Sequence, residues 1–151
     1  MNNKKVGKAF RIVALLLAIV MLLSVGAMAA EARSSLYLHA YSAYVYRAGW
    51  GKIQVWFDVT GTGYLDEIGA LEIRVYESKD NENWSWVKTY GYSDNAGMLG
   101  YNDFSHSGHI EYKGTLGRYY KAYVCIWGGK DGDGDTRYFW TNSEKATLFA
   151  E

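Results

Sequence analysis

The segment from Gly117 to Trp127 constrains the fold of this chain most strongly, because its side chains alternate in character along the whole segment. A period of two is that of a β-strand, in which successive side chains point to opposite faces of the sheet. One face carries Tyr120, Ala122, Val124 and Ile126, and the other carries Tyr119, Lys121, Tyr123, Cys125 and Trp127. The segment therefore predicts a central strand with one face in a core and a second face rich in aromatic rings.

Further alternating segments predict an all-β domain. Glycine is common between them, and proline is absent from the 151 residues. That combination favours strands over helices. A core face is clearest at Ile53, Val55, Phe57 and Val59. Strands are predicted over residues 36–47, 52–60, 71–78, 84–92, 109–113, 117–127 and 136–142. About seven short strands with turns every 8 to 12 residues or so predict a two-sheet antiparallel β-sandwich.

The segments between these strands predict turns and loops. A β-bulge near Ser42 is expected, because the tyrosines on either side of it change parity. Residues 64–69 are expected to form a turn or a single helical turn that plugs the core with Leu65 and Ile68. Residues 93–107 are expected to cross as a loop from one sheet to the other, and residues 128–135 to form a second loop.

The N-terminus has the pattern of an export signal. Four basic residues precede the apolar run 12–23, and small residues follow it up to Ala30. This pattern predicts a helical signal peptide over residues 1–29, cleavage after Ala29, and a single sandwich domain over residues 30–151. The protein is then secreted or extracellular, either free or associated with the cell surface. An uncleaved signal acting as an N-terminal membrane anchor is the alternative.

Charge and cysteine content exclude several classes of protein. The signal uses four of the sixteen Lys and Arg residues, so twelve remain against sixteen acidic residues, and the mature chain carries about −4. This net charge offers no electrostatic reason to bind nucleic acid or an anionic membrane, so a membrane partner is expected only through an uncleaved signal. A single cysteine, Cys125, excludes an intramolecular disulfide. Its position in the middle of a predicted strand, away from any helix N-terminus, also argues against a nucleophile.

Aromatic side chains opposite the predicted core faces are the candidate binding residues. Neighbouring strands could align them into one exposed stripe that stacks on sugar faces or anchors a protein interface. The alternative is that cross-strand aromatic pairs stabilise the sheet without a ligand, each by about 0.2 to 1 kcal/mol. The candidate residues are Trp56, Tyr76, Tyr119, Tyr123 and Trp127.

Two groups of residues could bind a metal. Asp131, Asp133 and Asp135 are spaced two apart, as calcium loops space their oxygen ligands. However, Thr136 stands where an EF-hand has glycine and Asn142 where it has glutamate, and a solvated hairpin loop is the alternative. The second group is His106, His109 and Glu111, which would need further ligands to hold zinc.

The strand order resembles fibronectin type III and immunoglobulin-like sandwiches. The resemblance rests on the I-x-V-x-F-x-V strand, the YESKDNENW hairpin and the Gly-x-Tyr-Tyr-x-Ala-x-Val segment. In those folds the penultimate strand carries a tyrosine followed by alternating small apolar residues, as Tyr120 to Val124 do here. The chain departs from them in having no proline and no paired cysteines. The resemblance implies an architecture and no activity.

Two further resemblances concern shorter phrases. FDVTGTGYLDEIGA, WVKTY and HSGHIEYKGTLGRYYKAYV make the chain look like a group of short exported proteins of unknown function from Gram-positive anaerobic bacteria. Residues 78–84 resemble the turn of sialidase-type Asp boxes and of discoidin-like sugar-binding modules, but the glycine is missing and the tryptophan comes one residue early for an Asp box. We therefore expect only a hairpin there.

Together these features predict a secreted non-catalytic binding or surface-interaction module that contacts a carbohydrate or a protein surface through exposed aromatic side chains. A structural or self-assembling cell-surface protein is one alternative, and a secreted enzyme acting on a saccharide is another.

Overall fold

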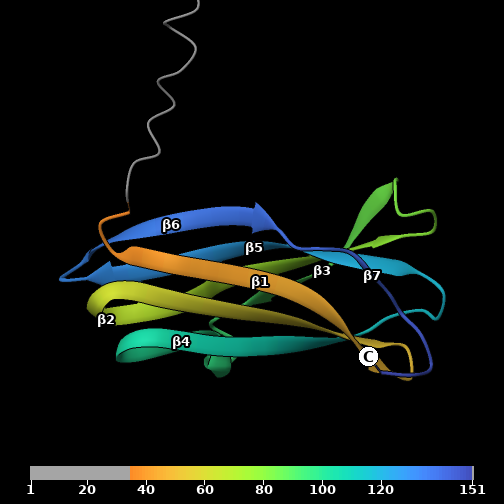
Figure 1. Ribbon diagram of the computed structural model, residues 1–151, viewed down its shortest axis with the longest axis horizontal. Coiled ribbons are helices and arrows are strands. Elements are labelled where there is room, and N and C mark those ends of the chain that lie inside the picture. Colours follow the sequence, from red (N-terminus) through yellow and green to blue (C-terminus); the bar gives the residue numbers. More distant parts are fainter. Residues whose placement is uncertain (1–34, 151) are drawn as a thin grey trace, which may run out of the picture. The chain divides into compact units, whose positions relative to one another are not determined.

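The computed structural model describes residues 35–150, which belong to one compact unit. Within them the chain forms only strands and one short 3-10 helix, so the all-β prediction is confirmed. No helix in this part of the chain is long and apolar enough to cross a membrane. The elements are β1 (Leu38–Gly49), β2 (Lys52–Ser78), β3 (Trp84–Gly91), η1 (Ala96–Met98), β4 (Leu99–Lys113), β5 (Tyr119–Lys130), β6 (Asp133–Trp140) and β7 (Glu144–Lys145) (Figure 1). The predicted signal helix and the cleavage site after Ala29 lie outside the described residues.

Strand β2 organises the sheet, because it pairs with four other strands. Its first half, residues 52–60, pairs with β1 on one side and β4 on the other, so that Val55 lies opposite Val45 and Ile110. Its second half, residues 67–78, pairs with β5, and residues 72–78 also pair with β3. Strand β6 continues the sheet beside β5, and β7 pairs with the start of β5. All of these pairings are antiparallel.

The prediction of two separate sheets is therefore wrong: the strands form one curled sheet. The expected turn at residues 64–69 is absent, because β2 continues through these residues and only its pairing with β4 is interrupted between Thr60 and Leu65. Glycines that break the alternation led to the prediction of a turn, whereas here they lie within a strand. Leu65 and Ile68 are nevertheless buried, as predicted. We call the part built on residues 52–60 the first half-sheet and the part built on residues 67–78 the second half-sheet.

One apolar core lies inside the curl. The predicted core faces are confirmed, since all eight of their side chains are buried. Both half-sheets contribute to the same cluster of buried residues. Its members include Val45, Ile53, Val55, Phe57, Val59, Ile110, Ile73, Val75, Tyr120, Ala122, Val124 and Ile126.

Strand β4 replaces most of the loop predicted over residues 93–107. Only η1 and the residues before it are irregular, and β4 begins at Leu99. The glycines of this segment suggested a loop, but glycine can also serve close packing within a strand, as at Gly108, which directly follows the segment. A Cβ there would lie 2.6 Å from the ring of Phe57. The small residue therefore lets the strand approach the core, and the segment keeps its strand pairing.

Side-chain hydrogen bonds join β1 and the residues before it to β6 and the residue Asn142 that follows it. Figure 1 shows the ribbons of β1 and β6 along the same side of the sheet. The Asp135 carboxylate accepts hydrogen bonds from the Ser35 hydroxyl at 2.5 Å and from the Tyr37 N–H at 3.1 Å. The Asn142 side chain accepts from the N–H of Val45 at 2.8 Å and donates to its carbonyl at 3.1 Å. These contacts link the two ends of the sheet although no backbone ladder joins β1 to β6.

The β-bulge predicted near Ser42 is not present, because the pairing of β1 with β2 is regular there. The register shifts lie between Leu38 and Ala40 and between Arg47 and Gly49 instead. Tyr41 keeps the parity of Val45, and its ring packs against Phe139 of β6 with the centroids 5.3 Å apart. The change in tyrosine parity therefore reflects contacts at the edge of the sheet.

The predicted hairpin between β2 and β3 is confirmed. Asp80 closes its turn, because its carboxylate accepts the N–H groups of Glu82 at 2.9 Å and Asn83 at 2.8 Å. Hydrogen bonds from Asn83, Glu82 and Ser78 hold the pKa of Asp80 well below its usual range.

Candidate functional site

The outward side of the second half-sheet carries a cluster of aromatic side chains. We call it the aromatic face, and it consists of Tyr76, Trp84, Trp86, Lys121, Tyr123, Tyr138 and Trp140. Strand register explains the cluster. Tyr76 lies opposite Lys121 on β5 and Trp86 on β3, and Tyr123 lies opposite Trp140 on β6. Because paired residues point to the same face of a sheet, these four strands present their rings together.

The rings of the aromatic face touch one another. The Trp140 ring lies 4.9 Å from Tyr76 in an edge-on arrangement and 4.9 Å from Tyr123. Tyr123 also stacks beside Tyr138 at 5.9 Å. The Lys121 ammonium group lies 4.3 Å from the ring centroids of both Trp84 and Trp140. Such cation–π contacts hold the long lysine side chain between two tryptophans.

Burial divides this face into a floor and exposed rings. Tyr76, Trp84, Lys121 and Tyr123 are half-buried. Above them three rings remain open to solvent, since Trp86 is 60% exposed, Tyr138 58% and Trp140 48%. Two of the three exposed rings pack against half-buried ones, since Trp140 contacts Tyr76 and Tyr123 and Tyr138 stacks beside Tyr123.

Polar groups lie between the rings. Arg74, which is opposite Tyr123, forms an ion pair with Glu72 at 2.5 Å. Hydrogen bonding to Glu72 raises the pKa of the Arg74 guanidinium. The indole N–H of Trp86 donates to the Thr89 hydroxyl at 3.0 Å. The aromatic face therefore combines apolar ring surfaces with hydrogen-bonding groups.

Cys125 lies under this face and is buried. Burial raises the pKa of its thiol, and hydrogen bonding to the thiol raises the pKa of Tyr138. A thiol with a raised pKa carries little thiolate near neutral pH, so Cys125 packs the sheet and is a poor nucleophile.

The structure brings together two of the five predicted binding residues. Tyr76 and Tyr123 meet through the ring of Trp140. Tyr119 instead lies under the ammonium group of Lys145, 5.2 Å from its ring centroid. Trp56 stands on the first half-sheet, where it stacks on His109 at 4.4 Å. The five residues therefore do not form the single stripe that neighbouring strands suggested.

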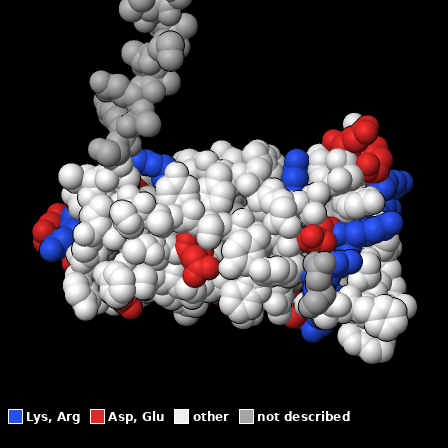
Figure 2. All heavy atoms as spheres, in the orientation of Figure 1, with Lys and Arg blue, Asp and Glu red and all other residues white. Residues whose placement is uncertain are grey.

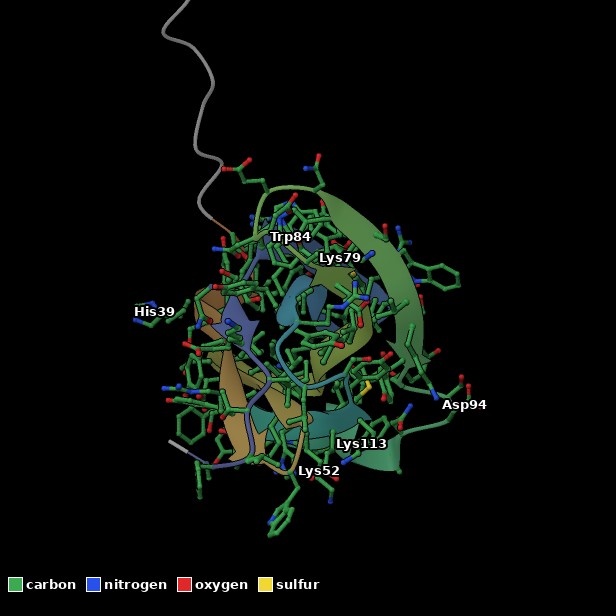
Figure 3. All side chains as sticks on the ribbon, turned by 90° about the vertical axis from the view of Figure 1, so that its right-hand side faces the viewer. His39, Lys52, Lys79, Trp84, Asp94 and Lys113 are labelled. Carbon is green, nitrogen blue, oxygen red and sulfur yellow. The ribbon has the colours of Figure 1, made fainter. Side chains whose placement is uncertain are left out.

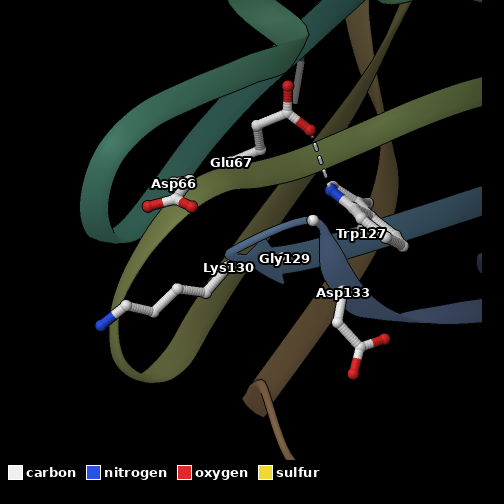
Figure 4. Close-up of a pocket in the computed structure, with 7 residues that line it drawn as sticks. Asp66, Glu67, Trp127, Gly129, Lys130 and Asp133 are labelled. Atoms are coloured by element: carbon white, nitrogen blue, oxygen red, sulfur yellow. Dashed lines mark hydrogen bonds between the residues drawn. The ribbon is translucent and has the colours of Figure 1, made fainter.

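Trp127, the fifth residue, lines a cavity of about 360 Å³ at the other end of β5 (Figure 4). Its indole N–H donates to the Glu67 carboxylate at 3.2 Å. The Asp66 carboxylate accepts the N–H of Asp131 at 2.7 Å, which ties the β5–β6 turn to β2. The lining residues are Asp66, Glu67, Trp127, Gly129, Lys130, Gly132 and Asp133.

The three aspartates proposed as calcium ligands belong to a tight hairpin. Asp131 and Gly132 have φ values of 53° and 81°, as a two-residue turn between Lys130 and Asp133 requires. Asp133 accepts a hydrogen bond from the Tyr37 hydroxyl at 3.2 Å, while Asp135 binds Ser35 and Tyr37. These bonds lower the pKa of Asp135. Among residues 35–150 there is no group of three or more His, Cys, Asp or Glu side chains that could hold a metal ion.

The two histidines considered for zinc point away from each other. His106 pairs with Val59 of the core face, and its ring nitrogen lies 2.9 Å from the Gly97 carbonyl oxygen. His109 pairs with Trp56 on the outward face. Glu111 forms an ion pair with Lys52 at 2.7 Å. Their odd spacing along one strand separates the two imidazoles.

Four aromatic residues of the face were missing from the sequence prediction: Trp84, Trp86, Tyr138 and Trp140. One signal could have revealed the last two. The Asp131-Gly132 pair is the strongest short hairpin signal, and a two-residue turn there fixes the register. That register places Trp140 opposite Tyr123 and Tyr138 opposite Cys125.

Comparison with protein-family models finds no match for this chain. Comparison with curated proteins finds none either.

Proposed function

We propose that this chain is an exported, non-catalytic binding module that binds a saccharide through the aromatic face. The observation that carries the proposal is the set of exposed rings, Trp86, Tyr138 and Trp140, on a floor of half-buried aromatic side chains. Export is supported by the N-terminal sequence, with its basic residues, apolar run and small residues.

A saccharide suits this surface because a sugar ring has apolar faces and a rim of hydroxyl groups. Aromatic rings offer flat apolar area together with polar edges, and they are already ordered by their neighbours. Arg74, Glu72 and the Tyr138 hydroxyl are placed to exchange hydrogen bonds with sugar hydroxyls. A few placed polar groups fix the orientation of a ligand on a largely apolar site.

As part of the same proposal, one local feature is shared with immunoglobulin-like domains, although the strands here form one curled sheet. This feature is Tyr120, whose buried hydroxyl accepts the N–H of Thr115, five positions earlier, at 2.7 Å and donates to the Glu77 carboxylate. Immunoglobulin-like sandwiches carry a tyrosine near the start of a late strand whose hydroxyl bonds to the backbone a few residues upstream. Such sandwiches commonly serve as contact modules.

The test uses residues 30–151, which contain the whole core, on a glycan array and in tryptophan fluorescence titrations. We expect binding to at least one polysaccharide and a change in emission. Trp140→Ala should weaken this binding at least tenfold, because it removes a ring that contacts both Tyr76 and Tyr123. Trp56→Ala is the matched control, since it removes an indole from the opposite half-sheet.

If no polysaccharide binds on the array or changes the tryptophan emission, the proposal that the ligand is a saccharide is wrong. If Trp56→Ala and Trp140→Ala weaken binding equally, the aromatic face is not the binding site. If instead a protein partner is captured and Trp140→Ala alone releases it, the face is a protein-binding surface.

A further inference from the structure

A second exposed apolar group lies at the end of the fold where β1 turns into β2. We call it the apolar tip, and it consists of Trp50, Leu116, Leu148 and Phe149. Their exposed fractions are 74%, 51%, 50% and 80%, respectively. Single exposed apolar residues are ordinary, but several large ones together indicate contact with something apolar.

The backbone under the tip is well held. The N–H of Trp50 donates to the Leu148 carbonyl and that of Gly51 to the Thr147 carbonyl, each at 2.9 Å. Gly49, Trp50 and Gly51 have φ values of 78°, 54° and 75°. A positive φ is uncommon for a tryptophan and persists only where the surroundings hold it. The turn thus presents the indole to solvent. Beside it lies a cavity of about 320 Å³, lined by Ala48, Gly49, Trp50, Leu148, Phe149 and Ala150.

Basic side chains surround the tip. The Lys113 ammonium group donates to the Trp50 carbonyl, and Lys52 lies opposite Lys113 in the register of β2 and β4. Figure 3, which views this end of the molecule, shows the two lysines on neighbouring strands. Figure 2 shows many of the Lys and Arg atoms of the visible face at the same end, together with acidic atoms, while the middle of the face carries few charges.

Among residues 35–150, the charge beside the tip is positive although the mature chain is acidic, and Glu151, next to Ala150 in the sequence, adds one acidic side chain. On β1, β2, β4 and β7 beside the tip, the basic residues are Arg47, Lys52, Lys113 and Lys145, and the acidic residues are Glu111 and Glu144. Glu144 pairs with Arg47 at 3.5 Å, and Glu111 pairs with Lys52 at 2.7 Å. Neither Lys113 nor Lys145 forms an ion pair with a carboxylate of residues 35–150. Two cations therefore remain to face an anionic partner.

From this arrangement we infer that the apolar tip inserts into the interfacial region of an anionic lipid bilayer. Tryptophan is enriched at the level of lipid headgroups, and lysine can extend to the phosphates while its methylene groups stay near the acyl chains. A rim of lysines argues against a protein partner, because lysine is depleted at protein interfaces. The aromatic face is a different surface, so this inference does not depend on the proposed function.

The test measures binding of residues 30–151, which lack the predicted signal, to vesicles. One set contains phosphatidylcholine with about a third phosphatidylglycerol, and the other contains phosphatidylcholine alone. Co-sedimentation gives the partition coefficient, and a blue shift of tryptophan emission reports insertion. We expect binding to the anionic vesicles that weakens as salt is raised.

Three variants locate the contact, and circular dichroism checks that each is folded. The double variant W50S/F149S should lower the partition coefficient at least tenfold, because it removes two large apolar side chains from the bilayer. Lys113→Gln should lower it about fivefold, as expected for the loss of one cation near an anionic surface. Trp86→Ser removes an exposed tryptophan from the aromatic face and should leave it unchanged.

Several outcomes would overturn the inference. One is the absence of binding to either set of vesicles. Others are equal binding to both sets, or equal loss in Trp86→Ser and W50S/F149S. A concentration-dependent dimer that W50S/F149S abolishes, without any vesicle binding, would show that a second copy of the chain covers the tip. A failure of glycan binding would leave this result untouched, because the two tests use different residues.

Discussion

On the first half-sheet the outward aromatic side chains find their partners within the sheet. Trp56 stacks on His109 and donates its indole N–H to the Gln54 side chain at 3.1 Å, while Tyr44 packs edge-on against Tyr46 at 4.8 Å. On the second half-sheet Tyr76 and Tyr123 support Trp140, whose own ring is 48% exposed. One sheet thus shows two arrangements of outward rings, namely separate pairs on the first half-sheet and a larger connected cluster on the second.

This difference shows that the number of aromatic residues does not predict a binding face. Hydrogen bonds occupy the polar edges on the first half-sheet, where Asp58 accepts the hydroxyl of Tyr44 at 3.3 Å and that of Ser107 at 2.5 Å. On the second half-sheet the strand register places tryptophans from two strands, β3 and β6, around Lys121 and Tyr76. The two half-sheets differ in the contacts that their outward aromatic side chains make, and not in whether they carry such side chains.

The largest expected effect tests whether the half-sheets are one folding unit. Phe57→Ala should lower the free energy of unfolding by about 3–5 kcal/mol, because it opens a cavity in the core that both half-sheets share. Urea unfolding followed by circular dichroism and by tryptophan fluorescence should give coincident transitions. Phe104→Ala, which removes an exposed phenylalanine, should change stability by less than about 0.5 kcal/mol. Transitions that do not coincide would mean that the half-sheets unfold separately.

The next effect concerns Tyr120, the second residue of β5 in the second half-sheet. Tyr120→Phe should cost about 1–3 kcal/mol, because the Glu77 carboxylate and the Thr115 N–H lose a hydrogen-bond partner. Tyr112→Phe is the control, since that ring packs beside Tyr120 with the centroids 5.6 Å apart. An unchanged midpoint of urea unfolding in Tyr120→Phe would show that this hydroxyl does not stabilise the fold.

The stability of the fold at alkaline pH should depend on the same hydroxyl group of Tyr120. Burial, together with the bond to Glu77, raises the pKa of Tyr120 to about 12 from the ordinary value of 10.0. The neutral phenol is therefore favoured in the folded state. Its contribution is complete below about pH 10 and should be lost as pH rises from about 10 through about 12. Tyr120→Phe should lose less stability over this range than the natural chain does, and equal losses would contradict the assignment.

A smaller effect separates the two outward faces directly. Trp56→Ala and Trp140→Ala should each cost about 0.5–1.5 kcal/mol, because each removes one set of aromatic contacts. Thermal unfolding measures this cost. Unequal losses of several kcal/mol would show that one half-sheet depends on its outward rings far more than the other does.

The smallest expected effect is that of calcium on the β5–β6 hairpin. Asp133 and Asp135 already accept hydrogen bonds from Ser35 and Tyr37, which precede β1. Chelation should therefore leave the melting temperature unchanged. A rise of several degrees on adding calcium would show that the three carboxylates converge on an ion after all.

Local pattern was sufficient for the strands whose alternation is unbroken. The core faces at Ile53 to Val59 and Tyr120 to Ile126 lie where their period of two placed them. The alternation of side chains did not predict the strands where glycine interrupts it, as at residues 61–69 and 100–108. In the sequence, a glycine that makes room for a neighbouring side chain cannot be distinguished from a glycine that ends a strand. Gly108, held against Phe57, is such a case.

The sequence by itself determined the all-β class and the buried side of residues 53–59 and 120–126, since both follow from the period of side chains along one strand. The sequence also contains the Asp131-Gly132 pair, whose turn sets the register of β5 with β6. Only the tertiary structure decided that β2 continues through both half-sheets, and so placed Trp56 and Tyr76 on different half-sheets. That outcome depends on contacts between residues distant in sequence, which no local period encodes.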